Sequence, residues 1–377
     1  MNEVLIHWLF GVSTCICTAK QNAHPGMCTY VAIERVRLGR RTSYALMGAG
    51  FHSGNGITMA IAIRLYITFV IPRMLSGLES LVLTPKEVDI LEGFHRRTLR
   101  QLQNLPVSTA KEAIYLLTGI LPIQGTLDQR ILNLFGAICR KKGEHIWNIA
   151  LNQLINKDSS SGSWFINVNK LLEKYDLPQA ADLLINPPTK EKWKTLVKLN
   201  THSTYKAQLL QDTTTKSSLK HLNFPSKGKL SAHRLWVCSA KNLDLNRKAY
   251  IKCKLMTHVY GLQKRIYGTK RNVTCRLCSL EEEDEEHFIS VCPLNEFKME
   301  RLKLLEILQE KDLLNKYTMC GPITNPANFT QLVLDCTAFI EDSWSEESIM
   351  CIETTMINFV YKMHEIRSKK MTELLQK

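Results

Sequence analysis

Apolar residues recur along much of this chain at the intervals of an α-helix. The clearest series follows Pro85, which suits the first turn of a helix, and consists of Val88, Leu91, Phe94, Leu99 and Leu102. Similar patterns predict helices near residues 58–75, 164–175 and 328–340, and a last helix that Ser345 caps. No run approaches the eighteen or so apolar residues that a membrane-spanning helix needs. The sequence therefore predicts a mainly α-helical protein without a membrane partner.

The composition is that of a folded intracellular protein. With 377 residues, 45% of them hydrophobic, the chain can form two or three domains with a sizeable core. Outside one motif, its cysteines lack the spacing of a disulfide framework, which favours reduced thiols. The apolar run from Leu5 to Ala19 is similar to a secretory signal, but the segment before it carries Glu3 and no Lys or Arg. We therefore expect a location in the nucleus or cytoplasm and leave residues 1–32 as an unassigned leader.

Positive charge is concentrated in residues 190–274. This segment holds nineteen Lys or Arg and three acids, so its net charge of +16 exceeds the +14 of the whole chain. Basic side chains neutralise phosphates, and aromatic side chains can stack on unpaired bases. Several aromatic residues are interleaved with these charges, although some of them must belong to the core: Trp193, Tyr205, Phe224, Trp236, Tyr250, Tyr260 and Tyr267. The segment predicts sequence-tolerant binding of RNA or DNA rather than of a small-molecule substrate.

The most specific motif follows this segment and combines three cysteines with one histidine. Cys275, Cys278, His287 and Cys292 have the spacing C-x2-C-x8-H-x4-C. Three thiolates and a neutral imidazole complete a tetrahedral zinc site and leave no position for water, so the pattern predicts a structural site rather than a hydrolytic one. The alternative is that Cys275 and Cys278 are ordinary, partly buried thiols and that His287 caps the next helix.

An acidic run occupies residues 281–286, inside this motif. Such a density of carboxylates can suggest a catalytic or calcium-binding site. We predict instead a solvated loop, whose negative charge precedes a helix that begins near Glu286 and complements the dipole of that helix.

Longer motifs connect these features to a known family. Residues 252–263 fit K-x-K-L-x-T-x-x-Y-x-L-Q and lead into C-x-L-C, an acidic spacer and H-F-x-x-x-C-P. Residues 40–50 fit R-R-T-x-Y-x-L-M-G-A-G, and residues 70–79 fit V-x-P-R-x-L-x-G-L-E. Together these motifs resemble the C-terminal portion of non-LTR retrotransposon reverse transcriptases, over about residues 33–340.

The resemblance implies a division of the chain into helical segments around a zinc knuckle, the loop that carries Cys275, Cys278, His287 and Cys292. A helical thumb-like region would occupy residues 33–156, and the polar, serine-rich residues 157–163 would open a linker with short helices over 157–189. The remaining segments would be a basic helical connector at 190–274, the zinc knuckle at 275–293 and C-terminal helices at 294–377.

Two groups of cations are the candidate nucleic-acid contacts. The first group lies nearest the knuckle and consists of Lys252, Lys254, Lys264, Arg265, Lys270 and Arg271. The second group shares one arc of the helix after Pro85 and consists of Arg96, Arg97 and Arg100. For the second group, a plain solvated helix face is an equal alternative to contact with a nucleic-acid backbone.

The chemistry of a polymerase is absent from the sequence. Nucleotide polymerisation needs closely placed aspartates that hold two metal ions, and the chain contains no Asp-Asp pair. It also lacks a nucleophile elbow, a Walker loop and an H-E-x-x-H motif. We therefore predict a truncated, non-catalytic remnant that binds RNA or DNA through the basic segment and the zinc knuckle. Two alternatives stay open: a zinc-stabilised protein-interaction scaffold without a nucleic-acid role, and a decaying element whose product has no function.

Overall fold

The chain folds into helices, which confirms the prediction of a mainly α-helical protein. The computed structural model describes residues 26–51, 56–224, 229–267, 273–310, 325–339 and 344–376, and no strand is assigned within these ranges. In the same ranges, the nearest approach to a sheet is an isolated antiparallel bridge between Thr274 and Glu282. None of the helices described there is long and apolar enough to cross a bilayer. Most of the predicted leader, together with Lys270 and Arg271, lies outside the described residues.

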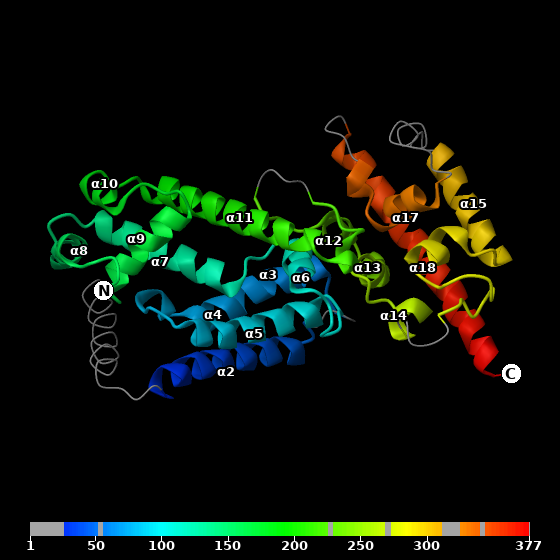
Figure 1. Cartoon of the computed structure of the whole chain (residues 1–377), viewed down its shortest axis with the longest axis horizontal. Helices are drawn as coiled ribbons and strands as arrows, with labels where there is room; N and C mark the ends of the chain where they lie inside the picture. Colours follow the sequence, from blue (N-terminus) through cyan, green and yellow to red (C-terminus); the bar gives the residue numbers. More distant parts are fainter. Residues whose placement is uncertain are drawn as a thin grey trace.

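Helices α2 to α11 form an N-terminal body, which occupies the left and centre of Figure 1. Its elements are α2 (Gly26–Gly48), α3 (Met59–Leu65), the π-helical turn η1 (Tyr66–Val70), α4 (Ile71–Leu75), the short turn η2 (Leu78–Ser80), α5 (Pro85–Leu102), α6 (Lys111–Thr118), α7 (Ile123–Cys139), α8 (His145–Asn156), α9 (Trp164–Lys174), α10 (Ala180–Ile185) and α11 (Lys190–Thr214). Helix α2 packs against α4 and α5, while α11 lies along α7.

Local sequence determines several helix ends in this body. The Thr84 side chain accepts a hydrogen bond from the Glu87 backbone N–H, and the Glu87 carboxylate accepts one from the Thr84 N–H, so a capping box begins α5 at Pro85. The helix predicted over residues 58–75 is confirmed as the continuous series α3, η1 and α4. The widened turn η1 ends at Val70, two residues before Pro72, which lacks the N–H that a regular helix would use.

Two glycines of α7 allow α11 to approach it closely. A Cβ atom at Gly136 would lie 2.3 Å from Nε1 of Trp193, and one at Gly125 would lie 2.6 Å from Cε2 of Tyr205. Both aromatic side chains are buried, and the Trp193 indole donates a 2.9 Å hydrogen bond to the Leu132 carbonyl. The first helix of the predicted basic connector is therefore part of the N-terminal body, held there by its aromatic residues.

A C-terminal body forms around α18 (Glu346–Leu375), the long helix at the right of Figure 1. Ser345 caps this helix, as predicted, by accepting a hydrogen bond from the Ser348 N–H. The other elements of this body are η3 (Ser217–Leu219), α12 (Arg234–Ser239), α13 (Leu243–Met256), α14 (Gln263–Tyr267), the π-helical turn η4 (His287–Val291), α15 (Asn295–Glu310), α17 (Pro326–Leu334) and η5 (Cys336–Phe339). Helix α18 packs against α12, α13 and α15.

A buried ion pair lies at the centre of the C-terminal body. The Nζ atom of Lys252 on α13 lies 2.6 Å from Oε1 of Glu353 on α18, and neither side chain is exposed. The Cys336 thiol donates a 3.1 Å hydrogen bond to the other carboxylate oxygen of Glu353. Lys252 is therefore a core residue that joins α13 to α18. The prediction that it contacts a nucleic acid is wrong, because its ammonium group is enclosed and its charge is already matched.

Polar contacts also join the two bodies. The Asn246 side-chain oxygen on α13 accepts a 2.9 Å hydrogen bond from the N–H of Met59, at the start of α3. Lys216 reaches the buried Glu112 carboxylate of α6 at 2.5 Å. Because these contacts link elements that are far apart in the sequence, the two bodies form one continuous helical assembly.

Candidate metal centre

The four residues of the cysteine–histidine motif converge in space. One ligand atom from each of Cys275, Cys278, His287 and Cys292 lies within 4.8 Å of the other three. The Sγ atom of Cys278 and the Nε2 atom of His287 are 3.4 Å apart. Cys275, His287 and Cys292 are buried, and Cys278 is partly exposed. The cluster could hold a metal ion, as the spacing of the motif predicts.

A tight turn of the backbone brings the first two cysteines together. The backbone N–H groups of Leu277 and Cys278 donate hydrogen bonds to the Cys275 sulfur. Ser279, with a left-handed φ of 57°, ends the turn, and its N–H donates a 2.8 Å hydrogen bond to the Cys275 carbonyl. The chain then returns, and the Cys275 N–H donates a 2.7 Å hydrogen bond to the Glu281 carbonyl. The turn therefore presents both sulfur atoms on the side that faces His287.

The proton distribution within the cluster suits a cation-binding site. A hydrogen bond from Cys292, together with others from His287 and the backbone, lowers the pKa of Cys275 to about 3. The Cys292 thiol donates that hydrogen bond and is buried, so its pKa is raised. Burial alone would lower the pKa of His287, but hydrogen bonds with Cys275 and Glu281 raise it to about 9. A metal ion would replace the protons on these ligands, because it binds thiolates and neutral imidazole.

A carboxylate orients the histidine from outside the cluster. The Oε2 atom of Glu281 lies 3.2 Å from Nδ1 of His287, while Nε2 faces Cys278. Metal-binding histidines generally hold a carboxylate or carbonyl at the second ring nitrogen, which fixes the tautomer and the ring orientation. Glu281 therefore supports the site, although the sequence alone assigned it only to an acidic loop.

A second carboxylate of the acidic run fastens the knuckle to α18. Glu283 is 2% exposed, and its two oxygens lie 2.7 Å and 2.9 Å from Nε and Nη2 of Arg367. The same carboxylate accepts a 2.9 Å hydrogen bond from the Gln263 N–H, and Arg367 donates another to the Gly261 carbonyl at 3.0 Å. The two-pronged contact therefore ties the knuckle, the start of α14 and the C-terminal helix together.

The prediction of a solvated acidic loop is wrong for two of its residues. Besides Glu283, Glu285 is 1% exposed, and its Oε1 atom lies 2.6 Å from Nδ1 of His258, an ion pair when that histidine is protonated. Glu281 and Glu282 are exposed, as predicted. The acidic run is not uniformly solvated, because its backbone passes along the C-terminal body and some of its side chains meet basic groups there.

Aromatic packing completes the attachment of the knuckle. Phe288, next to the histidine ligand, stacks on Tyr260 with 5.8 Å between ring centroids and meets the edge of Phe297 at 5.5 Å. Arg301 of α15 donates a 2.6 Å hydrogen bond to the Cys292 carbonyl. The residues beside two of the ligands are therefore fixed by contacts with α15 and with the segment before α14.

The cations nearest the knuckle are engaged mostly within the protein. Lys264 pairs with Glu282 at 3.0 Å and with Asp284 at 3.2 Å. Arg265 is exposed and donates a 3.2 Å hydrogen bond to the Ser108 hydroxyl. Lys254 is half-buried. Together with the burial of Lys252, these contacts leave little free positive charge beside the knuckle in the part of the chain that is described.

The three arginines of α5 do not have a common environment. Arg97 is exposed, whereas Arg96 and Arg100 are partly buried. Arg100 donates a 2.9 Å hydrogen bond to the Thr109 carbonyl, and burial and the neighbouring Arg96 lower its pKa. Arg97 is therefore the member of this group that is best placed to contact a ligand.

Most aromatic residues of the basic segment belong to the core. Those that are buried are Trp193, Tyr205, Trp236, Tyr250 and Tyr260. Phe224 is half-buried against His233, with 5.4 Å between ring centroids, and the side chain of Tyr267 lies outside the described part. The buried rings cannot stack on bases in this conformation.

Comparison with protein-family models, with curated proteins and with solved structures gives no match for this chain.

Proposed function

We propose that the chain is a zinc-stabilised helical protein that binds RNA or DNA and catalyses no reaction. The observation that carries the proposal is the closed four-residue cluster fastened to α18, while cations without carboxylate partners lie on other helices. In this proposal the knuckle fixes the C-terminal body rather than touching the nucleic acid itself. The resemblance to non-LTR retrotransposon reverse transcriptases agrees with it and stays a prediction.

Zinc is the metal that suits the donor set. With Zn–S bonds of about 2.3 Å and Zn–N bonds of about 2.0 Å, a tetrahedral site has S···N separations of about 3.5 Å and S···S separations of about 3.8 Å. Cys278 Sγ and His287 Nε2 are already 3.4 Å apart, and every other pair of ligand atoms lies within 4.8 Å. Closing those pairs by at most about 1 Å completes the site, and four protein ligands leave no place for a reactive water.

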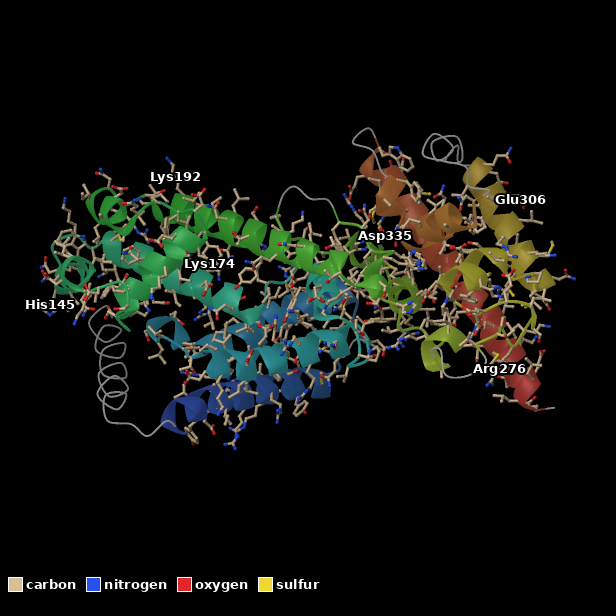
Figure 2. The ribbon with its side chains drawn as sticks, viewed as in Figure 1. His145, Lys174, Lys192, Arg276, Glu306 and Asp335 are labelled. Carbon is tan, nitrogen blue, oxygen red and sulfur yellow. The ribbon has the colours of Figure 1, made fainter. Side chains whose placement is uncertain are left out.

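Exposed lysines on α11 support the nucleic-acid part of the proposal. Lys190, Lys192, Lys194 and Lys198 are exposed, and none of them forms an ion pair with another described residue. Lys192 and Arg276 of the knuckle lie at opposite ends of the molecule in Figure 2. The free lysines of α11 therefore lie away from the knuckle, and binding through them should be insensitive to sequence and strongly weakened by salt.

The test combines metal analysis with binding by the full chain. A fragment confined to the basic segment and the knuckle would lack Arg367 and with it the contact to Glu283. We expect one zinc per chain by elemental analysis. We also expect short fluorescent RNA and DNA strands to bind with an affinity that falls steeply as salt is raised.

Removing the metal should weaken the fold first and binding as a consequence. A chelator, or Cys278→Ser, should lower the thermal midpoint, because metal binding is coupled to the folding of the small loop. Purified protein without zinc would refute the metal assignment. Zinc-loaded protein that binds no strand at low salt would refute the nucleic-acid assignment.

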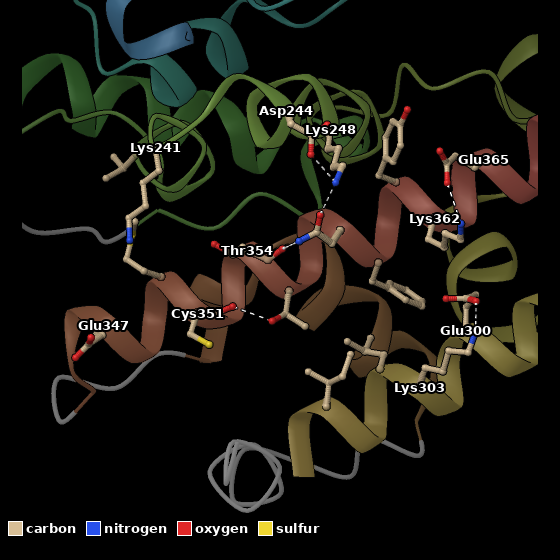
Figure 3. A pocket seen from close by; sticks show the side chains of 18 of the residues that line it. Lys241, Asp244, Lys248, Glu300, Lys303, Glu347, Cys351, Thr354, Lys362 and Glu365 are labelled. Carbon is tan, nitrogen blue, oxygen red and sulfur yellow. Dashed lines mark hydrogen bonds and ion pairs between the residues drawn. The ribbon is translucent and has the colours of Figure 1, made fainter. Parts of the chain in front are cut away.

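A zinc-stabilised protein-interaction scaffold is the second candidate, and a groove favours it. The groove has a volume of about 1410 Å³ and is lined by residues of α12, α13, α15 and α18 (Figure 3). Three of its four lysines are paired with neighbouring acids: Lys248 with Asp244, Lys303 with Glu300 and Lys362 with Glu365. Because five acids and four lysines line the groove, it has little attraction for phosphate. Zinc-loaded protein without strand binding would therefore favour the scaffold.

A further inference from the structure

A small notch between α2 and α5 brings two arginines together. Its volume is about 170 Å³, and its lining residues are Arg40, Ser43, Tyr44, Phe94, Arg97, Thr98 and Gln101. Arg40 and Arg97 come from different helices and are both exposed, and neither forms an ion pair with another described residue. Two arginines that line one notch without a carboxylate repel each other, so they favour an anion beside them.

The surrounding sequence provides no acid to fill this role. Between Glu34 and Glu79 the chain contains six arginines and no Asp or Glu. Both flanking acids are occupied, because Glu34 pairs with Arg37 and Glu79 pairs with Arg130 at 3.0 Å. No carboxylate lines the notch itself. The positive charge there is therefore left for a ligand from outside the chain.

Close packing of the two helices makes the notch narrow. A Cβ atom at Gly39 would lie 3.2 Å from the Phe94 ring. Because glycine has no Cβ, α2 and α5 can approach closely there. Thr98 is buried, and its hydroxyl donates a 3.0 Å hydrogen bond to the Phe94 carbonyl. Ser43 is 8% exposed, while Tyr44 is 63% exposed beside it. A polar notch thus lies next to a free aromatic ring.

We propose that Arg40 and Arg97 bind a backbone phosphate of RNA or DNA in this notch, with Tyr44 placed to stack on an adjacent base. The inference rests on the proposed nucleic-acid binding and names its central contact. A volume of about 170 Å³ admits a tetrahedral oxyanion. Guanidinium forks bind phosphate oxygens in pairs, and exposed aromatic rings stack on bases with little sequence preference.

The experiment compares two double variants that remove the same charge. Arg40→Gln/Arg97→Gln removes both positive charges from the notch. Lys142→Gln/Lys157→Gln removes two exposed lysines that flank α8 and do not line the notch. Both pairs are at the surface, so equal thermal midpoints by circular dichroism should confirm that each variant folds. Binding of a fluorescent single strand is then titrated over a range of salt concentrations with the full-length proteins.

The notch variant should bind at least ten-fold more weakly than the lysine variant. The slope of log K against log salt should fall by about 0.7 for each phosphate contact that is lost. Equal, small losses in both variants, with wild-type binding intact, would overturn the notch and leave the proposed function in place. Absence of binding by the folded, zinc-loaded wild type would overturn both.

Discussion

Replacing Lys252 by Met should destabilise the protein severely, although lysine is usually a surface residue. The substitution leaves the Glu353 carboxylate buried without its partner, because the two side chains have no exposed area and their charged groups lie 2.6 Å apart. Removing one partner of such a pair costs about 3–5 kcal/mol, because the remaining charge is buried and uncompensated. That is a large share of the roughly 5–15 kcal/mol by which a native protein is stable.

Removing both charges should restore most of the lost stability. In Lys252→Met/Glu353→Met no charge is buried, and apolar side chains of similar length fill the space, so we expect stability within about 1–2 kcal/mol of the wild type. The Cys336 thiol then loses its acceptor, which adds a cost of about 1 kcal/mol. If Glu353→Met alone costs about as much as Lys252→Met, the two single substitutions and the double one should show a coupling of at least about 3 kcal/mol.

Urea denaturation measures this coupling in the C-terminal body. Tryptophan fluorescence is a suitable signal, because Trp236 is buried beside Tyr250 of α13, with 5.3 Å between ring centroids. Lys241→Met is the control, since Lys241 is exposed and its loss should change stability by about 0.5 kcal/mol or less. If Lys252→Met behaves like that control, Lys252 is not in the core, and its role as a nucleic-acid contact has to be considered again.

Two further predictions concern packing and pH. Gly136→Ala should destabilise the protein by about 1–3 kcal/mol, because the added Cβ would meet Trp193. Gly93→Ala, in a helix interior where a Cβ would have no atom within 4 Å, should stabilise it by about 0.5–1 kcal/mol. If urea denaturation shows that both substitutions change the stability in the same direction, the packing is contradicted. Burial raises the pKa of Glu92 from 4.5 to about 7, so the folded state holds that proton more tightly and stability from Glu92 is lost as pH rises through this window. Burial lowers the pKa of His95 from 6.5 to about 4, so stability from His95 is lost as pH falls, and the two slopes offset each other in the wild type. Glu92→Gln should uncover the rise with pH and His95→Gln the fall, each on the order of 3 kcal/mol in denaturation series, and unchanged slopes in both variants would refute the assignment.

The features that the sequence predicted correctly depend on short-range patterns. The helix after Pro85 and the one capped by Ser345 follow from turn-length periodicity and from a single capping residue. The metal cluster follows from ligands that lie within eighteen residues of one another, between Cys275 and Cys292. Its outer partner Glu281 is equally local, but six consecutive acids give no sign of which one faces the histidine.

The position of Lys252 was within reach of the same reasoning. On α13 it shares a face with Leu245, Ala249 and Met256, at intervals of four, three and four residues, and these three residues are buried. A lysine in an apolar stripe indicates a buried partner, and Glu353 has the same place on α18, next to buried Ile349 and Met356. Proximity to the knuckle in sequence was a weaker guide than this periodicity.

Long-range pairs explain why the net charge of residues 190–274 overstates the free positive charge of that segment. Glu283 pairs with Arg367, which lies 84 residues away in the sequence, and no local pattern predicts that contact. Several cations of residues 190–274 are matched in the same way by acids from outside the segment: Lys216 by Glu112, Arg234 by Glu346, Lys252 by Glu353 and Lys264 by Glu282.

The field that a phosphate strand experiences comes from unpaired charge, not from the net charge of a segment. A matched, buried cation such as Lys252 adds nothing to the potential at the surface, even though it counts fully in the sequence. Arg40 and Arg97 add only two charges to the net charge of the chain, yet they line the same notch, which no carboxylate lines. If binding depends on potential at contact distance, the notch between α2 and α5 should matter more than the cations beside the knuckle.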